Sequence, residues 1–118
     1  MYQEKNWILL RVFLTDRDKY DGRPLYSEIV LKCRELGLKG ATVLRGLIGY
    51  GNSGVLHSAG ILSMSDSLPL VLEVCDESDK IDSALPFFRK MMDESGCGGL
   101  ITMEAARVIH FDERKSDA

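Results

Sequence analysis

The segment Ala41-Thr-Val-Leu-Arg-Gly-Leu-Ile48 runs directly into Gly49-Tyr-Gly-Asn-Ser-Gly-Val-Leu-His-Ser-Ala-Gly60, and residues 46–60 hold five of the eleven glycines of the chain. The β-branched and aliphatic residues predict a strand over residues 41–50. The glycines predict a long exposed loop, because glycine adopts positive φ and lets a ligand approach the backbone closely. Consecutive N–H groups in such a loop can bind an anion. The alternative interpretation is a long hairpin whose turns simply need glycine.

A strand and an amphipathic helix are predicted before this segment. Residues 7–14, Trp-Ile-Leu-Leu-Arg-Val-Phe-Leu, form an apolar run of strand length that only Arg11 interrupts. Pro24 suits the first turn of a helix, and Gly37 suits its C-terminal cap. The apolar residues between them follow helical spacing: Leu25, Ile29, Cys33 and Leu36.

A strand, a second helix and a last strand are predicted after the glycine segment. Residues 68–75 form an apolar strand, and residues 63–67 either continue the loop or begin that strand. Residues 76–79 offer N-capping oxygens to a helix in which Pro86 predicts a kink or a late start. Residues 95–99 are a second glycine-rich loop, and residues 100–111 form the last strand. The apolar stripe of the second helix comprises Ile81, Ala84, Leu85, Phe88 and Met92.

The resulting order, βαββαβ, predicts an α+β, ferredoxin-like fold with a four-stranded antiparallel sheet and both helices on one face. We expect one domain over residues 1–118, with a core over about 7–111 and a polar tail over 112–118. The opposite sheet face should then expose either Trp7, Leu9 and Phe13 or the alternating set Ile8, Leu10, Val12 and Leu14. Because both sets are apolar, we expect the sheet to self-associate.

Composition excludes several classes of partner. The net charge is −3 and no basic cluster occurs, which argues against nucleic-acid binding. No apolar run reaches the length of a membrane span, and residues 1–6 do not resemble a signal peptide. We therefore expect a cytoplasmic protein that is not inserted in a membrane.

The three cysteines are widely spaced and form no C-x-x-C pair, so we predict neither a disulfide framework nor a metal site. Cys33 and Cys75 fall on apolar positions and are predicted to be core thiols. Cys97 lies between two glycines and is predicted to be exposed, with no neighbouring cation to lower its pKa.

A few polar residues are candidates for binding. His57 could contact a ligand, or else order the loop, and His110 could contact a ligand or pack at the strand edge. Arg11 and Arg45 lie in apolar strands and each needs a salt bridge, a ligand or a subunit contact. Nothing in the sequence pairs Glu73 or Glu104 for acid–base work, and no catalytic constellation occurs, so we predict no enzymatic activity.

Two sets of residues resemble nitrogen-regulatory PII signalling proteins. The run Arg34-Glu-Leu-Gly-Leu-Lys-Gly-Ala-Thr-Val43, continuing to Gly49-Tyr-Gly-Asn-Ser-Gly54, is similar to the end of their first helix, their second strand and the start of their long loop. Gly96-Cys-Gly-Gly-Leu-Ile101 and Ala106-Arg-Val-Ile109 are similar to their second loop and last strand. Residues 18–26, residues 40–46, His57 and Leu68-Pro69 resemble, more closely, a bacterial and archaeal family of uncharacterised PII-like proteins.

The resemblance implies a homotrimer with inward-facing sheets and a ligand cleft between neighbouring subunits. In PII proteins the cleft binds ATP or ADP, and the long loop then docks on a transporter, enzyme or regulator. Genes of the uncharacterised family often lie beside putative fluoride-exporting channels, which implies a membrane transporter or fluoride channel as partner. The ligand-binding residues expected here are Arg45, Gly49, Gly51, Asn52, Ser53, Gly54, His57, Gly96, Gly98, Gly99, Arg107 and His110. We expect a Cβ to strain the backbone at Gly49, Gly51 and Gly54.

The chain departs from PII proteins at the positions of three cations. Where those proteins place one lysine and two arginines against phosphates, this chain has Leu100, His110 and Asp112. We therefore expect weak ATP binding and a less charged ligand, either an adenine nucleotide or a small anion. The predicted function is a PII-like regulator, and the alternatives are a small enzyme that uses His57 as a base or a ligand-free accessory subunit of a channel.

Overall fold

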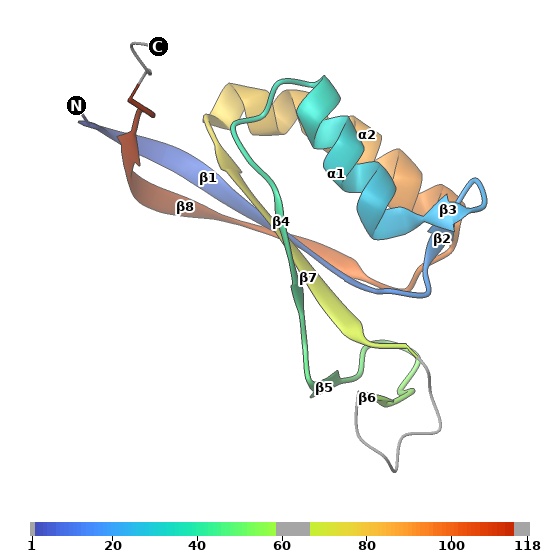
Figure 1. Cartoon of the computed structure of the whole chain (residues 1–118). Helices are drawn as coiled ribbons and strands as arrows, with labels where there is room; N and C mark the ends of the chain where they lie inside the picture. The colour runs from blue at the N-terminus through green and yellow to red at the C-terminus, as the bar shows by residue number, and fades with distance from the viewer. Residues whose placement is uncertain (1, 59–66, 115–118) are drawn as a thin grey trace.

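The computed structural model describes residues 2–58 and 67–114, and it has the predicted α+β architecture. The four-stranded sheet has the order β4-β7-β1-β8 with every neighbouring pair antiparallel. Both helices lie on one face of this sheet (Figure 1). The main elements are β1 (Tyr2–Thr15), α1 (Leu25–Glu35), β4 (Thr42–Arg45), β7 (Pro69–Asp76), α2 (Ser78–Ser95) and β8 (Leu100–Phe111). The order of strands and helices in the sequence is the ferredoxin-like order, so the predicted fold class is confirmed.

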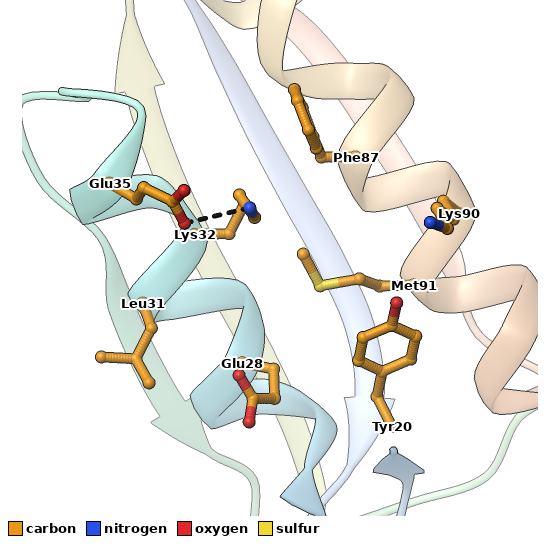
Figure 2. Close-up of a pocket in the computed structure, with 8 residues that line it drawn as sticks. All are labelled: Tyr20, Glu28, Leu31, Lys32, Glu35, Phe87, Lys90 and Met91. Carbon is orange, nitrogen blue, oxygen red and sulfur yellow. Dashed lines mark ion pairs between the residues drawn. The ribbon is translucent and has the colours of Figure 1, made fainter.

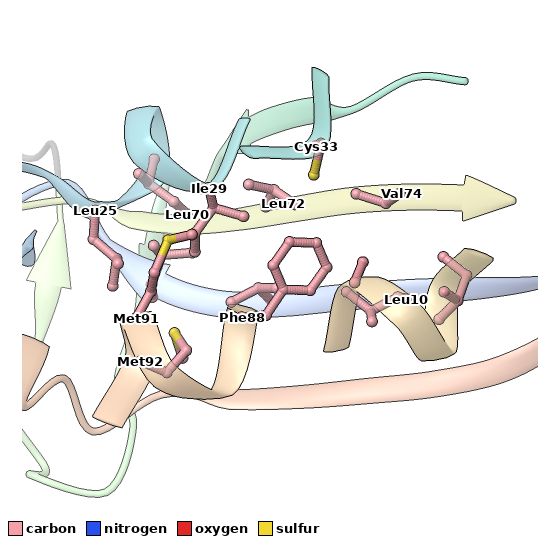
Figure 3. Close-up of a cluster of buried hydrophobic side chains, with 14 residues drawn as sticks. Leu10, Leu25, Ile29, Cys33, Leu70, Leu72, Val74, Phe88, Met91 and Met92 are labelled. Atoms are coloured by element: carbon pink, nitrogen blue, oxygen red, sulfur yellow. The ribbon is translucent and has the colours of Figure 1, made fainter. Parts of the chain in front are cut away.

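The core lies between the helices and the two central strands (Figure 3). Alternate residues of β1 pair with alternate residues of β7, as in Leu10 with Val74 and Val12 with Leu72, so that one face of both strands points at the helices. Ile29 of α1 and Phe88 of α2 are fully buried against this face. Burial of each such side chain contributes about 1.5–3 kcal/mol. Because folding needs this burial, apolar residues recur at the positions that face the core, and their spacing predicted these helices and strands.

The helix ends agree with the sequence in one case and differ in the other. Gly37 has a φ of 76° and its N–H donates to the Arg34 carbonyl at 3.1 Å, while the Leu38 N–H donates to the Cys33 carbonyl at 3.0 Å. This is the glycine cap expected for α1. In contrast, α2 already begins at Ser78, so the late start given as one alternative for Pro86 does not occur. The N-cap residue Glu77 makes no side-chain capping bond, but the carboxylates of Asp76 and Asp79 accept the Glu77 and Lys80 N–H groups at 2.7 Å and 3.0 Å.

The predicted strand over residues 41–50 is divided in two. β4 ends at Arg45, and the Gly46 N–H then donates to the Pro69 carbonyl at 2.7 Å. A Cβ on Gly46 would lie 2.9 Å from Cγ of Pro69, so the chain passes very close to the proline as it leaves the sheet. It then forms a hairpin of β5 (Ile48–Gly49) and β6 (His57–Ser58). The strand or loop predicted for residues 63–67 lies outside the described residues except for Ser67.

β1 is longer than predicted because β8 pairs with its residues 2–13. β7 pairs with β1 only from Ile8 onward, so residues 2–7 and 106–111 form a two-stranded extension, which we call the ribbon. A second short hairpin, β2 (Lys19–Tyr20) with β3 (Arg23–Pro24), precedes α1.

The open face of the sheet is less apolar than expected. Arg11 donates through Nε to Glu73 Oε2 at 2.8 Å and pairs with Glu104 as well, so the two carboxylates predicted to be isolated share one guanidinium. Phe13 is 38 % exposed, as expected, but Trp7 is only 4 % exposed. The prediction of an exposed Trp7 is therefore wrong, since strand alternation takes no account of side chains that fold over the ribbon.

The burial of two of the three cysteines differs from the prediction. Cys33 is a core thiol, and burial raises its pKa to about 11. Cys75 lies partly exposed opposite Leu9, outside the core, so the prediction of a core thiol is wrong. Cys97 is partly buried with its Sγ 3.6 Å from Sδ of Met92, and the prediction of an exposed thiol is wrong too.

Asp76, at the end of β7, is a fully buried carboxylate that the sequence did not reveal. Burial raises its pKa, but hydrogen bonds from the Glu77 and Lys39 N–H groups and the Lys39 ammonium outweigh burial and lower it overall. The Lys39 ammonium lies 3.2 Å from Oδ1. The pair joins the turn after α1 to the end of β7.

We predict that Asp76→Asn destabilises the protein by about 1–3 kcal/mol at neutral pH, the usual cost of disrupting a buried hydrogen-bonded group. Because the folded-state pKa is lowered, this stabilisation is present above the unfolded pKa of about 4 and is lost as pH falls through the folded value. Urea unfolding should therefore show the difference between wild type and variant shrinking below about pH 4. The exposed Asp79→Asn is the control, and an equal loss in both variants would contradict the role of Asp76.

Candidate functional site

The two glycine-rich loops lie together within one chain. The Asn52 side-chain amide donates to the Gly98 carbonyl at 3.4 Å, which joins the β5–β6 hairpin to the loop between α2 and β8. Inside the hairpin, the Gly54 N–H donates to the Gly51 carbonyl at 2.9 Å and the Val55 N–H donates to Oγ of Ser53 at 3.2 Å. We call residues 49–57 and 96–99 together the loop half-site.

The glycines of the loop half-site have different roles. Gly54 has a φ of 73°, which strains any residue with a Cβ, as predicted. At Gly51 φ is not positive and a Cβ would meet nothing, and at Gly49 it would make only ordinary contact with Pro69, so the strain predicted at these two positions is wrong. At Gly99 a Cβ would lie 1.9 Å from the Phe13 carbonyl oxygen. The backbone there touches β1.

His57 and Arg45 lie beside this half-site. Nδ1 of His57 contacts the hydroxyl of Ser67, which is buried just before β7, so the imidazole links the hairpin to the sheet. This geometry agrees with the interpretation of His57 as a residue that orders the loop. Arg45 is exposed at the end of β4, and within residues 2–58 and 67–114 it forms no ion pair, unlike the salt bridge that its strand position suggested.

The remaining predicted residues, Arg107 and His110, lie on the ribbon. Arg107 pairs with Glu4. The His110 ring centroid is 5.4 Å from that of Trp7, and its Nδ1 is 3.8 Å from Asp112. Nζ of Lys39 lies 5.2 Å from the Trp7 ring centroid. Arg107 points from the opposite face of the ribbon, because it lies three positions from His110 on the same strand. We call Trp7, Lys39 and His110 the ribbon half-site, and sequence reasoning missed its first two members because their proximity depends on long-range packing.

The two half-sites occupy opposite ends of the chain. At about 3.3 Å per residue, the ten steps of β8 from Leu100 to His110 span roughly 33 Å. Figure 1 shows the β5–β6 hairpin at one end and the ribbon at the other. One copy of the chain therefore cannot bring all predicted ligand-binding residues around one ligand.

Pockets among the described residues lie on the helical side of the chain. One of about 310 Å³ lies between α1 and α2, where Lys32 pairs with Glu35 at 3.0 Å and lies over Phe87 (Figure 2). The other, of about 300 Å³, is lined by Tyr20, Asp21 and Glu94, and a hydrogen bond to Glu94 raises the pKa of Tyr20. None of the predicted ligand-binding residues lines either pocket.

Sequence comparison identifies the relatives of the chain. Residues 7–108 match the model of the family DUF190, described as Uncharacterized ACR, COG1993. The chain belongs to the DUF190 (UPF0166) family. It is similar to a UPF0166 protein of Aquifex aeolicus, with 34 % identity over 87 % of this chain and 93 % of that protein. A UPF0166 protein of Methanocaldococcus jannaschii is 32 % identical over 75 % of this chain and 81 % of the relative.

Solved structures place this DUF190 protein in the PII-like fold. CPII, a nitrogen regulatory PII-like protein from Thiomonas intermedia bound to ADP, AMP and bicarbonate, matches with a TM-score of 0.67 over 90 % of this chain and 91 % of that one, at 15 % identity. A putative PII-like signalling protein from Thermus thermophilus matches with a TM-score of 0.63 over 89 % and 91 %, at 18 % identity. The names of these relatives describe signalling or uncharacterised proteins, and the suspected family is confirmed.

Two further observations bear on the candidate site of this DUF190 protein. Across residues 2–58 and 67–114, no helix is both long and apolar enough to cross a membrane. In the same part of the chain, no three side chains of His, Cys, Asp or Glu gather in a way that could hold a metal ion.

Proposed function

We propose that this DUF190 protein is a PII-like regulator that binds a small anionic or nucleotide-like effector between the subunits of a homotrimer. The observation that carries the proposal is the separation of the loop half-site from the ribbon half-site at opposite ends of one chain. In a closed ring of three copies, the ribbon of one copy can meet the loops of the next, so that each interface holds one complete cleft.

The open sheet face is the proposed trimer interface. Leu44 of β4 and Leu100 of β8 are about half exposed there, and Phe13 lies between them on β1. At its centre the Arg11 guanidinium forms ion pairs with both Glu73 and Glu104, so assembly would not bury an unpaired charge. An apolar face with a satisfied polar centre favours burial against identical copies.

The proposed effector is an adenine nucleotide of low charge or a small anion. Backbone N–H groups around Gly54 and Gly98 can bind oxygen atoms, Arg45 and Arg107 can supply charge, and His110 can offer a hydrogen bond. The ligands of CPII, which are ADP, AMP and bicarbonate, fall in the same chemical classes. The protein would act by binding rather than by catalysis, in the cytoplasm and without nucleic acid.

The β5–β6 hairpin is the proposed output of the regulator. Leu47, Ile48 and Tyr50 are strongly exposed on it, and it carries no charged residue between Arg45 and His57. Because Asn52 connects the hairpin to the second glycine loop, an effector bound at that loop would alter the position of the hairpin. A membrane transporter, such as a fluoride channel, is the proposed partner.

Light scattering tests the assembly on which this function depends. In dilute buffer we expect a mass three times the 13.2 kDa of one chain. Calorimetry on the same sample should detect AMP or bicarbonate binding with one site per subunit. A stable 13.2 kDa monomer would contradict the intersubunit cleft, and therefore the proposed function.

The glycines of the hairpin offer a matched pair of variants. We predict that Gly54→Ala weakens AMP or bicarbonate binding about tenfold, because a Cβ at positive φ costs about 1–2 kcal/mol and forces the loop to rearrange. Gly51→Ala should bind as wild type does, since its Cβ would meet nothing within 4 Å. Calorimetry decides between them, and identical affinities for all three proteins would mean that the hairpin is a passive connection.

A further inference from the structure

Trp7 contains the one buried side-chain nitrogen or oxygen, within residues 2–58 and 67–114, that has no hydrogen-bond partner: its indole Nε1. The residue is 4 % exposed, and it is the only tryptophan of the chain. A buried N–H without an acceptor is unfavourable, because it has lost its water and nothing replaces it. An acceptor supplied from outside the described chain would remove this penalty.

The groups around the indole are partly exposed, and two of the three are ammonium groups. Nζ of Lys39 and Nζ of Lys5 lie 5.2 Å and 5.9 Å from the ring centroid, and the His110 ring lies 5.4 Å away. The three side chains are each about one third exposed. Asp76 holds Lys39 in place, whereas the Lys5 ammonium lies on a flexible stem beside the partly exposed Glu77 and can swing toward solvent. Displacement of Lys5 would give an anion beside Lys39 access to the indole N–H.

The charge balance around the indole limits the charge of such an anion. Lys39 pairs with Asp76 at 3.2 Å, and Lys5 lies 3.8 Å from Glu77. Asp112 is 3.8 Å from His110. The three carboxylates outnumber the two ammonium groups, so a triphosphate would be repelled strongly and a singly charged oxyanion least, and the uncharged indole N–H supplies the attraction that selects it.

We infer that Trp7 recognises the ligand, donating the hydrogen bond of its Nε1–H to an oxygen of a singly charged oxyanion held in the ribbon half-site by Lys39 and His110. This inference rests on the proposed function and adds to it a neutral donor and a charge class. The charge of the two lysines by itself would favour the most highly charged anion. The nearby carboxylates and the uncharged indole donor shift the preference to a monoanion.

The single tryptophan makes a direct test possible. A proton–nitrogen correlation spectrum of the full chain contains one indole signal, which reports on this N–H alone. We expect bicarbonate or acetate to move that signal in a saturable way, and ATP at equal concentration to move it little. An indole signal that stays fixed while the backbone amides of Gly98 or Ala106 titrate would overturn the role of Trp7 and leave the proposed function standing.

A matched pair of variants completes the test. Trp7→Phe keeps an aromatic ring but removes the donor, and we expect about tenfold weaker binding of bicarbonate or acetate with an unchanged oligomeric mass. Tyr2→Phe removes a hydroxyl from an exposed ring of the same ribbon and should bind as wild type does. Equal affinity in Trp7→Phe and wild type would overturn the inference.

The outcome does not depend on whether Trp7→Phe folds, because the wild-type titration uses no variant. If no signal titrates with bicarbonate, acetate, AMP or ATP, the effector-binding function is itself contradicted, and the inference with it. The two failures are thus distinguished by whether the backbone amides respond.

Discussion

Gly99→Ala is expected to destabilise the protein by about 3 kcal/mol or more, at the upper end of overpacking effects. A Cβ at this position would lie 1.9 Å from the Phe13 carbonyl oxygen and 3.1 Å from Cε of Met92. Met92 could move, but the carbonyl belongs to β1 in the middle of the sheet and cannot. Against a total stability of about 5–15 kcal/mol, the loss is a large fraction of what holds the domain folded.

Thermal unfolding should show a fall in Tm on the order of 10 °C for Gly99→Ala. Gly98→Ala is the matched control, because a Cβ on Gly98 would make only an ordinary contact with Asn52 at 3.9 Å. The control should unfold within a few degrees of wild type. If the two variants had equal Tm values, the close approach of this loop to β1 would be disproved.

Gly99 also shows where sequence reasoning stops. The segment Gly96-Cys-Gly-Gly99 was predicted as a loop, and each glycine in it had the same local explanation. In the structure, Gly96 adopts a φ of 70° as the cap of α2, Gly98 faces Asn52, and Gly99 touches β1. Only contacts between segments distant in sequence distinguish these roles, so composition and spacing could not.

The fold itself was predictable because each main element buries one face. Ile29 and Cys33 of α1, and Ile81 and Phe88 of α2, follow the helical period and enter the core as the sequence indicated. The errors occur where a tertiary contact overrides a local pattern. Pro69 lies against Gly46 and interrupts the strand predicted for residues 41–50.

The candidate site was predictable only in part. The loop half-site follows from the glycine pattern, and the hydrogen bond from Asn52 to Gly98 joins its two segments. Trp7 and Lys39 were missed because a tryptophan in an apolar strand and a lysine in a turn carry no local signal of ligand binding. Their meeting at the ribbon depends on Asp76, whose buried carboxylate holds Lys39 in place.

The last prediction concerns the charge of the nucleotide, and we expect ATP to bind this DUF190 protein weakly or not at all. Leu100, His110 and Asp112 occupy the positions at which PII proteins are expected to present cations to phosphates. Leu100 is 53 % exposed and offers no charge, and Asp112 would repel a phosphate. Calorimetry at neutral pH that gave micromolar affinity for ATP would contradict this expectation.

Restoring the cations should reverse the effect. We predict that a variant combining Leu100→Lys, His110→Arg and Asp112→Arg binds ATP at least about 100-fold more tightly than wild type, because each charge-assisted contact contributes about 1.5–3 kcal/mol and each 1.4 kcal/mol is a factor of ten. The control introduces the same change in net charge on exposed helix positions through Leu31→Lys, Asp79→Lys and Ser83→Lys. Since only the first variant places its cations beside the proposed cleft, a comparable gain in the control would mean that phosphate does not bind at Leu100 and the ribbon.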